Sequence, residues 1–234
     1  MNRLVAIVVT LVACSGLVLS GCSESAPKED KKTVQETISD IGTEFAEAKY
    51  LEFALTTEKL PSDVNGIKSA IGSGNRTPAF VGDIDLVTGG TAVGAEVISR
   101  DGEVWAKTAV GGPLFLKIDP ASIDAPDPAL LVGTSNDGLV AIFDQATELK
   151  SDGKSREGNL VLETIVGTLP GSLFADLLPT ASGKNPFTVK FRVTEQGAFH
   201  DLMVTGEFYR GNTTTYRLKI SIPEEPVVIP QPNA

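Results

Sequence analysis

The stretch FTVKFRVTEQGAFHDLMVTGEFYRGNTTTYRLKISI, residues 187–222, decides the fold of this chain. Apolar side chains occupy alternate positions in three successive segments, which is the pattern of strands with one buried and one wet face. Gln196-Gly197 and Gly211-Asn212 separate these segments and are typical of tight turns. The stretch therefore predicts three adjacent antiparallel strands that share an apolar face.

The same alternation continues upstream in shorter segments, so the sheet is expected to be large. Asp101-Gly102 lies between two such segments and is a strong signal for a two-residue hairpin. The alternating segments are centred on residues 51–55, 67–71, 80–86, 93–97, 104–106 and 160–164. We expect about nine or ten strands in all, joined mostly by short turns.

Three helices are expected to cover the apolar face of this sheet. Thr33 and Glu36 match a capping box, and apolar residues follow at helical spacing up to Ala48. A second amphipathic helix is predicted from Asn136-Asp137 to about Lys150, and a short third one between residues 170 and 179. Strands and helices together indicate a single α+β domain with an antiparallel sheet.

Successive side chains of a strand point to opposite faces of the sheet, so the apolar residues at alternate positions are expected to point toward the helices. Whether these side chains fill a solid core or line a ligand cavity is not decided by alternation alone. The selected residues are Leu51, Phe53, Ile84, Leu86, Val93, Ala95, Val97, Val104, Leu160, Leu162, Phe191, Leu202 and Val204 from strands, and Leu139, Phe143, Leu173 and Leu177 from helices.

The N-terminal residues carry a targeting signal. Leu19-Ser20-Gly21-Cys22 closes an apolar run that starts after Arg3, and this order is typical of a bacterial lipobox. We expect residues 1–21 to be a signal peptide and Cys22 to carry a diacylglyceryl group, followed by a polar tether up to residue 32. The mature protein would then be a lipid-anchored protein on the extracytoplasmic, periplasmic side of the cell membrane.

Composition narrows the possible functions. The formal net charge of −10 disfavours nucleic-acid binding. Cys14 falls in the signal peptide, so the mature chain has no second cysteine for a disulfide, and we expect neither a metal site nor a cofactor. His200 is the only histidine, and no nucleophile motif accompanies it, so we expect no catalytic activity.

The order and spacing of several short motifs resemble those of the LppX/LprG family of cell-envelope lipoproteins from actinobacteria with mycolic-acid walls. Two departures are Pro113, where the family usually carries a tryptophan, and one extra residue before His200 in the last turn. The matching motifs lie at residues 60–61, 82–90, 101–107, 118–120, 137–139 and 195–200, after the lipobox.

This resemblance implies a U-shaped half-barrel sheet, over residues 33–223, whose concave face is covered by helices that enclose an apolar cavity. A Pro-rich tail would follow at residues 224–234. The resemblance also implies a monomeric carrier that binds multi-acylated lipids (triacylglycerol, phospholipid or glycolipid) and moves them across the cell envelope. An inner-membrane efflux-type transporter is the partner that it implies.

Two other functions stay open at this point. One is a structural or adhesive surface lipoprotein with a solid core and no ligand, which a cavity smaller than a few hundred cubic ångströms would favour. The other is an esterase, which would need a serine and a carboxylate beside His200.

The lipobox generates a first prediction. Metabolic labelling with an acyl probe should mark the wild-type protein, and Cys22→Ala should abolish both the label and membrane association, because Cys22 is the only cysteine after the expected cleavage point. A Cys22→Ala protein that remains labelled and membrane-bound would refute this anchoring site.

Overall fold

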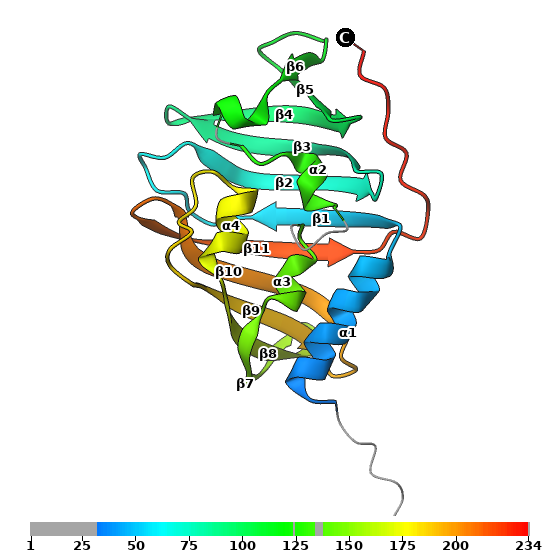
Figure 1. The fold of residues 1–234 in the computed structure, drawn as a ribbon, viewed down its shortest axis with the longest axis vertical. Coiled ribbons are helices and arrows are strands. Elements are labelled where there is room, and N and C mark those ends of the chain that lie inside the picture. Colours follow the sequence, from blue (N-terminus) through cyan, green and yellow to red (C-terminus); the bar gives the residue numbers. More distant parts are fainter. Residues whose placement is uncertain (1–31, 124, 134–137, 234) are drawn as a thin grey trace, which may run out of the picture. The chain divides into compact units, whose positions relative to one another are not determined.

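The computed structural model describes residues 32–123, 125–133 and 138–233, which form one open sheet with short helices on one face (Figure 1). The strands are β1 Tyr50–Thr56, β2 Gly66–Asn75, β3 Ala79–Thr88, β4 Thr91–Arg100, β5 Glu103–Thr108, β6 Leu116–Ile118, β7 Thr147–Glu157, β8 Leu160–Leu169, β9 Phe187–Thr194, β10 Phe199–Tyr209 and β11 Asn212–Ser221. The helices are α1 Val34–Glu47, α2 Pro128–Leu131, α3 Ala141–Asp144 and α4 Gly171–Leu177, with a 3-10 turn, η1, at Pro120–Ile123. The predicted antiparallel α+β fold is confirmed.

The strand order divides the sheet into two meanders. The order is β6-β5-β4-β3-β2-β1-β11-β10-β9-β8-β7, so sequence neighbours pair everywhere except where β1 meets β11. At that seam Phe53 lies opposite Ile220. β6 and β7 lie at opposite edges of the order, and the sheet does not close into a barrel.

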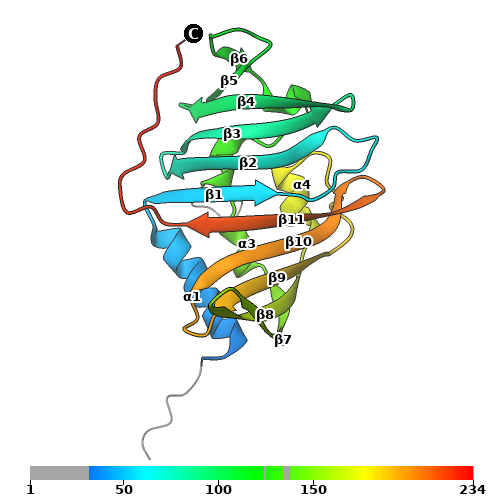
Figure 2. The same cartoon turned by 180° about the vertical axis from the view of Figure 1, so that it is seen from behind.

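The register places apolar side chains in rows that cross the sheet on the side of the helices, which we call the inner face. Directly opposite residues of antiparallel strands lie on the same face. One such row runs from β8 to β4 through Ile165, Phe191, Leu202, Leu218, Leu55, Ala70, Ile84 and Ala95. The view from behind shows the opposite, outer face, which the helices leave uncovered (Figure 2).

The first helix begins where the capping box predicts. The Thr33 hydroxyl accepts a hydrogen bond from the Glu36 N–H at 3.2 Å, and the Glu36 carboxylate accepts one from the Thr33 N–H at 2.7 Å. Ile38, Ile41 and Phe45 are buried against the core, as their spacing predicts. The sequence therefore determines both the start and the buried side of α1.

The hairpin predicted at Asp101-Gly102 is also confirmed. Both residues have positive φ, 56° for Asp101 and 74° for Gly102, as the two central residues of a type I′ turn require. Arg100 and Glu103 pair directly across the turn, which connects β4 to β5 without a bulge.

The helix predicted from residues 136 to 150 is wrong in its extent. Residues 136–137 lie outside the described residues, and the described part of the segment contains only the single turn α3 before β7 begins at Thr147. Nearly every side chain of β7 is exposed, and Leu149 is its only large apolar residue. A polar edge strand has no alternating pattern, so pairing with β8, rather than local sequence, decides its conformation.

The described residues of the Pro-rich tail, 224–233, contain no helix or strand. In both views this segment runs past the strands of the first meander toward β6 (Figures 1 and 2). The Phe115 N–H donates to the carbonyl oxygen of Asn233 at 3.4 Å, and Arg100 donates to that of Ile229 at the same distance. The tail is thus attached next to the edge strand.

A buried ion-pair cluster lies on the outer face of the second meander. Asp201 is fully buried, and its carboxylate accepts hydrogen bonds from Nε and Nη2 of Arg192. Nη1 of Arg192 also donates to the Glu157 carboxylate at 2.5 Å. Arg217 Nε lies 3.4 Å from the same Asp201 carboxylate. Glu157 ends β7, so the cluster connects the β7–β8 hairpin to β9 and β10.

The pKa of Asp201 is lowered by this cluster. Burial alone would raise the pKa of its carboxyl group, but the hydrogen bonds and charge of Arg192, with the charges of Arg217 and His200, outweigh burial. A carboxyl group with a lower pKa in the folded state stabilises the protein above its unfolded pKa, and that stabilisation is lost as the pH falls.

Removal of the buried carboxylate should therefore be costly. Asp201→Asn leaves Arg192 without its main partner, and we expect a loss of about 3 kcal/mol in the free energy of unfolding at pH 7. The wild-type melting temperature should fall as the pH drops below the ordinary Asp value of 3.8, and the variant should lose part of this pH dependence.

The matched control is Lys154→Ala, which breaks a half-exposed pair with Glu195 and should cost less than about 1 kcal/mol. Urea unfolding measures both variants. Equal effects of the two substitutions would contradict a special role for the buried cluster.

Candidate functional site

The inner face and the helices line a partly open apolar cavity of about 100 Å³. Its walls come from β1, β2, β10 and β11 on one side and from α2, α3 and α4, with their flanking residues, on the other. The lining residues are Leu55, Ile67, Pro126, Leu131, Leu139, Ile142, Phe174, Leu177, Leu178, Leu202, Val204, Phe208, Tyr209, Tyr216 and Leu218. With no charged lining residue, the cavity suits an apolar ligand.

The polar groups that line this cavity are two tyrosine hydroxyls. Tyr216 donates to the carbonyl oxygen of Ile67 at 2.6 Å, and its oxygen lies 2.7 Å from that of Tyr209. Because the Ile67 carbonyl can only accept, Tyr209 must donate to Tyr216. Burial raises the pKa of both phenols, so both stay neutral.

The helices that cover the inner face, which we call the helical cover, are bound to the sheet by Arg76 in the turn between β2 and β3. Its guanidinium donates to the carbonyl oxygens of Phe45 and Ala48, where α1 ends, and to those of Val132 and Gly133, directly after α2. The last carbonyl groups of a helix have no partner within the helix, so a half-buried arginine satisfies the ends of both helices at once.

The structure brings part of the predicted site together. Leu139, Leu177, Leu202 and Val204 line the cavity. The other residues that face the same interior are packed into the core beside it: Leu51, Phe53, Ile84, Ala95, Val97, Val104, Phe143, Leu173 and Phe191. Leu86 and Val93 pair with each other in the next inner-face row, and both are half-buried.

The assignment of Leu160 and Leu162 to the helix-covered face is wrong. Leu162 pairs with Thr194, whereas Ile165, an odd number of positions along β8, pairs with the inner-face residue Phe191. Both leucines therefore point to the outer face, and Leu160 is 46% exposed. The alternation within residues 160–164 indicates a strand but does not show which of its faces is covered.

Sequence reasoning missed several cavity residues that it had already placed on strands and helices. Leu55, Phe208, Tyr216 and Leu218 follow the same alternation as the residues that were chosen, and Ile142 and Phe174 lie on the apolar sides of the predicted helices. The alternation identified these residues as buried. It gave no information about where packing leaves a gap.

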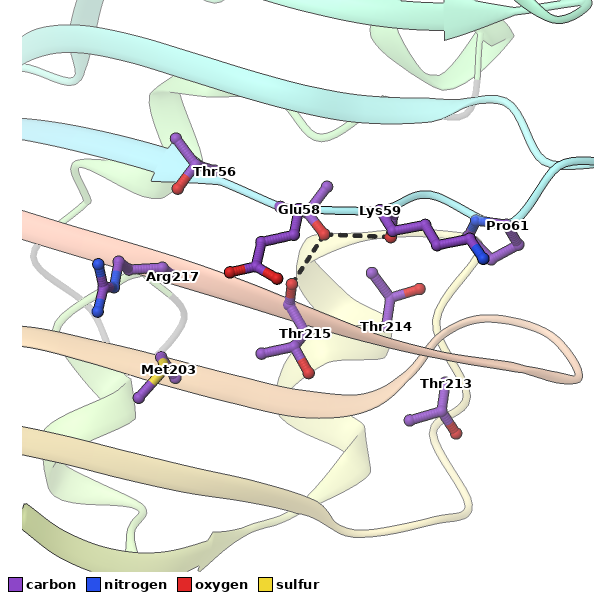
Figure 3. Close-up of a pocket in the computed structure, with 10 residues that line it drawn as sticks. Thr56, Glu58, Lys59, Pro61, Met203, Thr213, Thr214, Thr215 and Arg217 are labelled. Carbon is purple, nitrogen blue, oxygen red and sulfur yellow. Dashed lines mark hydrogen bonds between the residues drawn. The ribbon is translucent and has the colours of Figure 1, made fainter.

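A second, larger hollow of about 650 Å³ lies over β1, β10 and β11 (Figure 3). Its walls carry threonine hydroxyls together with Glu58, Lys59 and Arg217. The Thr57 hydroxyl donates to the carbonyl oxygens of Thr215 and Lys59 at 2.8 and 3.3 Å. A hollow with this polar, charged lining does not suit an acyl chain.

His200 lies beside an acid that two arginines already bind. Its Nδ1 lies 3.3 Å from Asp201, whose carboxylate is held by Arg192 and Arg217. Among the described residues, no group of three or more His, Cys, Asp and Glu side chains is placed to hold a metal ion. The expectation that the protein is not an enzyme stays a prediction.

The structure thus combines an open antiparallel sheet with an apolar cavity under a helical cover. The sequence matches the family described as LppX_LprAFG lipoprotein over residues 33–229, and the chain belongs to this family. The resemblance seen in the sequence motifs is thereby confirmed.

Two solved structures share the fold. LprF from Mycobacterium bovis is similar with a TM-score of 0.68 and 15% identity, over 86% of this chain and 97% of that one. The lipoprotein LppX of Mycobacterium tuberculosis gives a TM-score of 0.56 and 18% identity, over 85% of this chain and 100% of that one. No curated protein matches the sequence. In the described part of the chain, no helix is long and apolar enough to cross a membrane.

The Arg76 contacts generate a prediction about the cover. Arg76→Met removes four hydrogen bonds to carbonyl oxygens, and we expect a loss of about 2 kcal/mol in the free energy of unfolding. Amide hydrogen exchange should accelerate most in α2 and in the last turn of α1.

Arg156→Met is the matched control, because Arg156 is exposed on β7 and its loss should change stability by less than about 0.5 kcal/mol. Uniform acceleration of exchange across the whole sheet in Arg76→Met would show that Arg76 does not act on the cover in particular.

Proposed function

We propose that this protein is a membrane-anchored lipid carrier of the periplasmic side that holds acyl chains between its inner face and its helical cover. The observation that carries the proposal is the cavity at the centre of the domain, whose lining is apolar except for two mutually bonded tyrosine hydroxyls. Its ligands would be multi-acylated lipids, such as a triacylglycerol, a phospholipid or a glycolipid.

The size of the cavity requires the cover to move when a lipid binds. About 100 Å³ is below the range of roughly 300–1,000 Å³ that ligand pockets usually have. The cover over the cavity consists of α2, α3 and α4, which have four, four and seven residues. Such short helices depend on tertiary contacts, so they can separate from the sheet without unfolding it.

Acyl chains would replace the contacts that are lost when the cover opens. Each methylene buried from water contributes about 0.8 kcal/mol, so a few long chains suffice for tight retention. The lipid anchor at Cys22 would keep the carrier at its membrane, and a transporter of the efflux type in the inner membrane is the partner proposed for loading. The acidic net charge of −10 does not favour bulk attraction to anionic head groups.

The second candidate function is a solid-core structural or adhesive lipoprotein without ligand. The observation that favours it is the same small volume of about 100 Å³. In that case the cavity is an ordinary packing defect, and the purified protein carries no lipid.

Val204→Trp tests the cavity. Val204 lines it, whereas Val189, directly opposite on β9, is fully buried and does not. We expect Val204→Trp to keep the melting temperature within a few degrees and to reduce bound lipid, because the indole occupies the space of the ligand. Val189→Trp should overpack the core and cost about 1–3 kcal/mol.

The measurements are thermal unfolding and native mass spectrometry of the full-length protein purified from membranes. Lipid that co-purifies with wild type and is depleted in Val204→Trp supports the carrier. If wild-type protein carries no lipid and takes up no added diacylglycerol, the carrier function is contradicted and the solid-core function is favoured.

A further inference from the structure

The apolar cavity adjoins a second cavity at one place. A surface cavity of about 310 Å³ lies between the start of β2, the end of β3 and η1. It shares three lining residues with the apolar cavity, namely Ile67, Leu178 and Tyr209. These three residues form the border between the two cavities, and we call them the door.

We propose that the door is the entrance through which acyl chains reach the apolar cavity, with the surface cavity as its vestibule. This inference rests on the proposed function and adds to it the route of the ligand. The described residues that line the vestibule are uncharged, in a protein with a net charge of −10. An acyl chain that passes along these residues therefore removes no charged group of theirs from water.

The door is held by weak interactions that can open and close. Tyr209 is connected to β2 by the hydrogen bonds from Tyr209 to Tyr216 and from Tyr216 to the Ile67 carbonyl. A Cβ atom at Gly66 would lie 2.2 Å from the Tyr209 hydroxyl, so the ring packs directly on the β2 backbone. Leu178 follows the last residue of α4 and is only half-buried. Rotation of Tyr209 and Leu178 would join the two cavities without breaking the sheet.

The opposite end of the interior is closed by a cluster of aromatic rings. Phe45 of α1, Phe143 of α3 and Phe199 of β10 contact one another with ring centroids 5.3–5.4 Å apart. Phe143 also lies 5.4 Å from Phe191. Opening this end would separate several fully packed rings, whereas the door requires movement of three side chains.

The test is the rate at which the full-length protein takes up a pyrene-labelled diacylglycerol from phosphatidylcholine vesicles. Leu178→Ala widens the door and should accelerate uptake about tenfold. Leu160→Ala is the matched control, because this leucine is exposed on the outer face and lines neither cavity. It should leave the uptake rate near that of wild type.

Tyr209→Phe provides a second door variant of nearly the same shape. It removes the hydrogen bond to Tyr216 and should also accelerate uptake, so the test does not depend on the folding of Leu178→Ala. Uptake that is accelerated equally by Leu160→Ala, or unaffected by both door variants, would overturn the proposed entrance while the carrier function stands. Absence of uptake by wild type and all variants would overturn the carrier function itself.

Discussion

Removal of one apolar sheet face from water is the constraint that governs this structure. Eight of the eleven strands, from β8 to β4 in the sheet, present a continuous apolar row on their inner face. The described elements that cover it are one helix of 14 residues and three of four to seven. Such short helices cannot be stable alone. Arg76 binds the ends of α1 and α2 to the β2–β3 turn. Buried side chains along α1, α3 and α4 attach the rest of the cover to the inner face.

The features that local sequence determines were predicted well. Strand alternation, the capping box at Thr33 and the turn at Asp101-Gly102 each depend on neighbouring residues, and each appears as expected. β7 was missed because its polar residues become a strand only through pairing with β8. The face of Leu160 and Leu162 depends on register across strands, which no local pattern records. The Arg76 contacts join segments far apart in the sequence, and a single arginine in a turn gives no signal of them.

The sequence predicts which sheet face carries the candidate site, but it does not predict which residues line the cavity. Parity identified the face on which Leu202 and Val204 point to the helices, and both line the cavity. The position of the gap depends on how side chains from several elements fill space together, which is a property of the packed interior. The contrast between the two faces is clearer. The apolar cavity on the inner face has a bonded tyrosine pair as its polar groups, whereas the outer face carries the buried Arg192–Asp201 pair and a polar hollow.

The seam between β1 and β11 has a consequence for how the chain folds. Every other strand pairing joins sequence neighbours, so both meanders can form from local hairpins. Only the pairing of residues such as Phe53 and Ile220 requires closure of a loop that spans nearly the whole domain. The entropy of that closure must be overcome before the seam yields any contact energy. The seam is therefore the strand pairing with the longest sequence separation, and we expect its closure to limit how fast the sheet becomes a single cooperative unit.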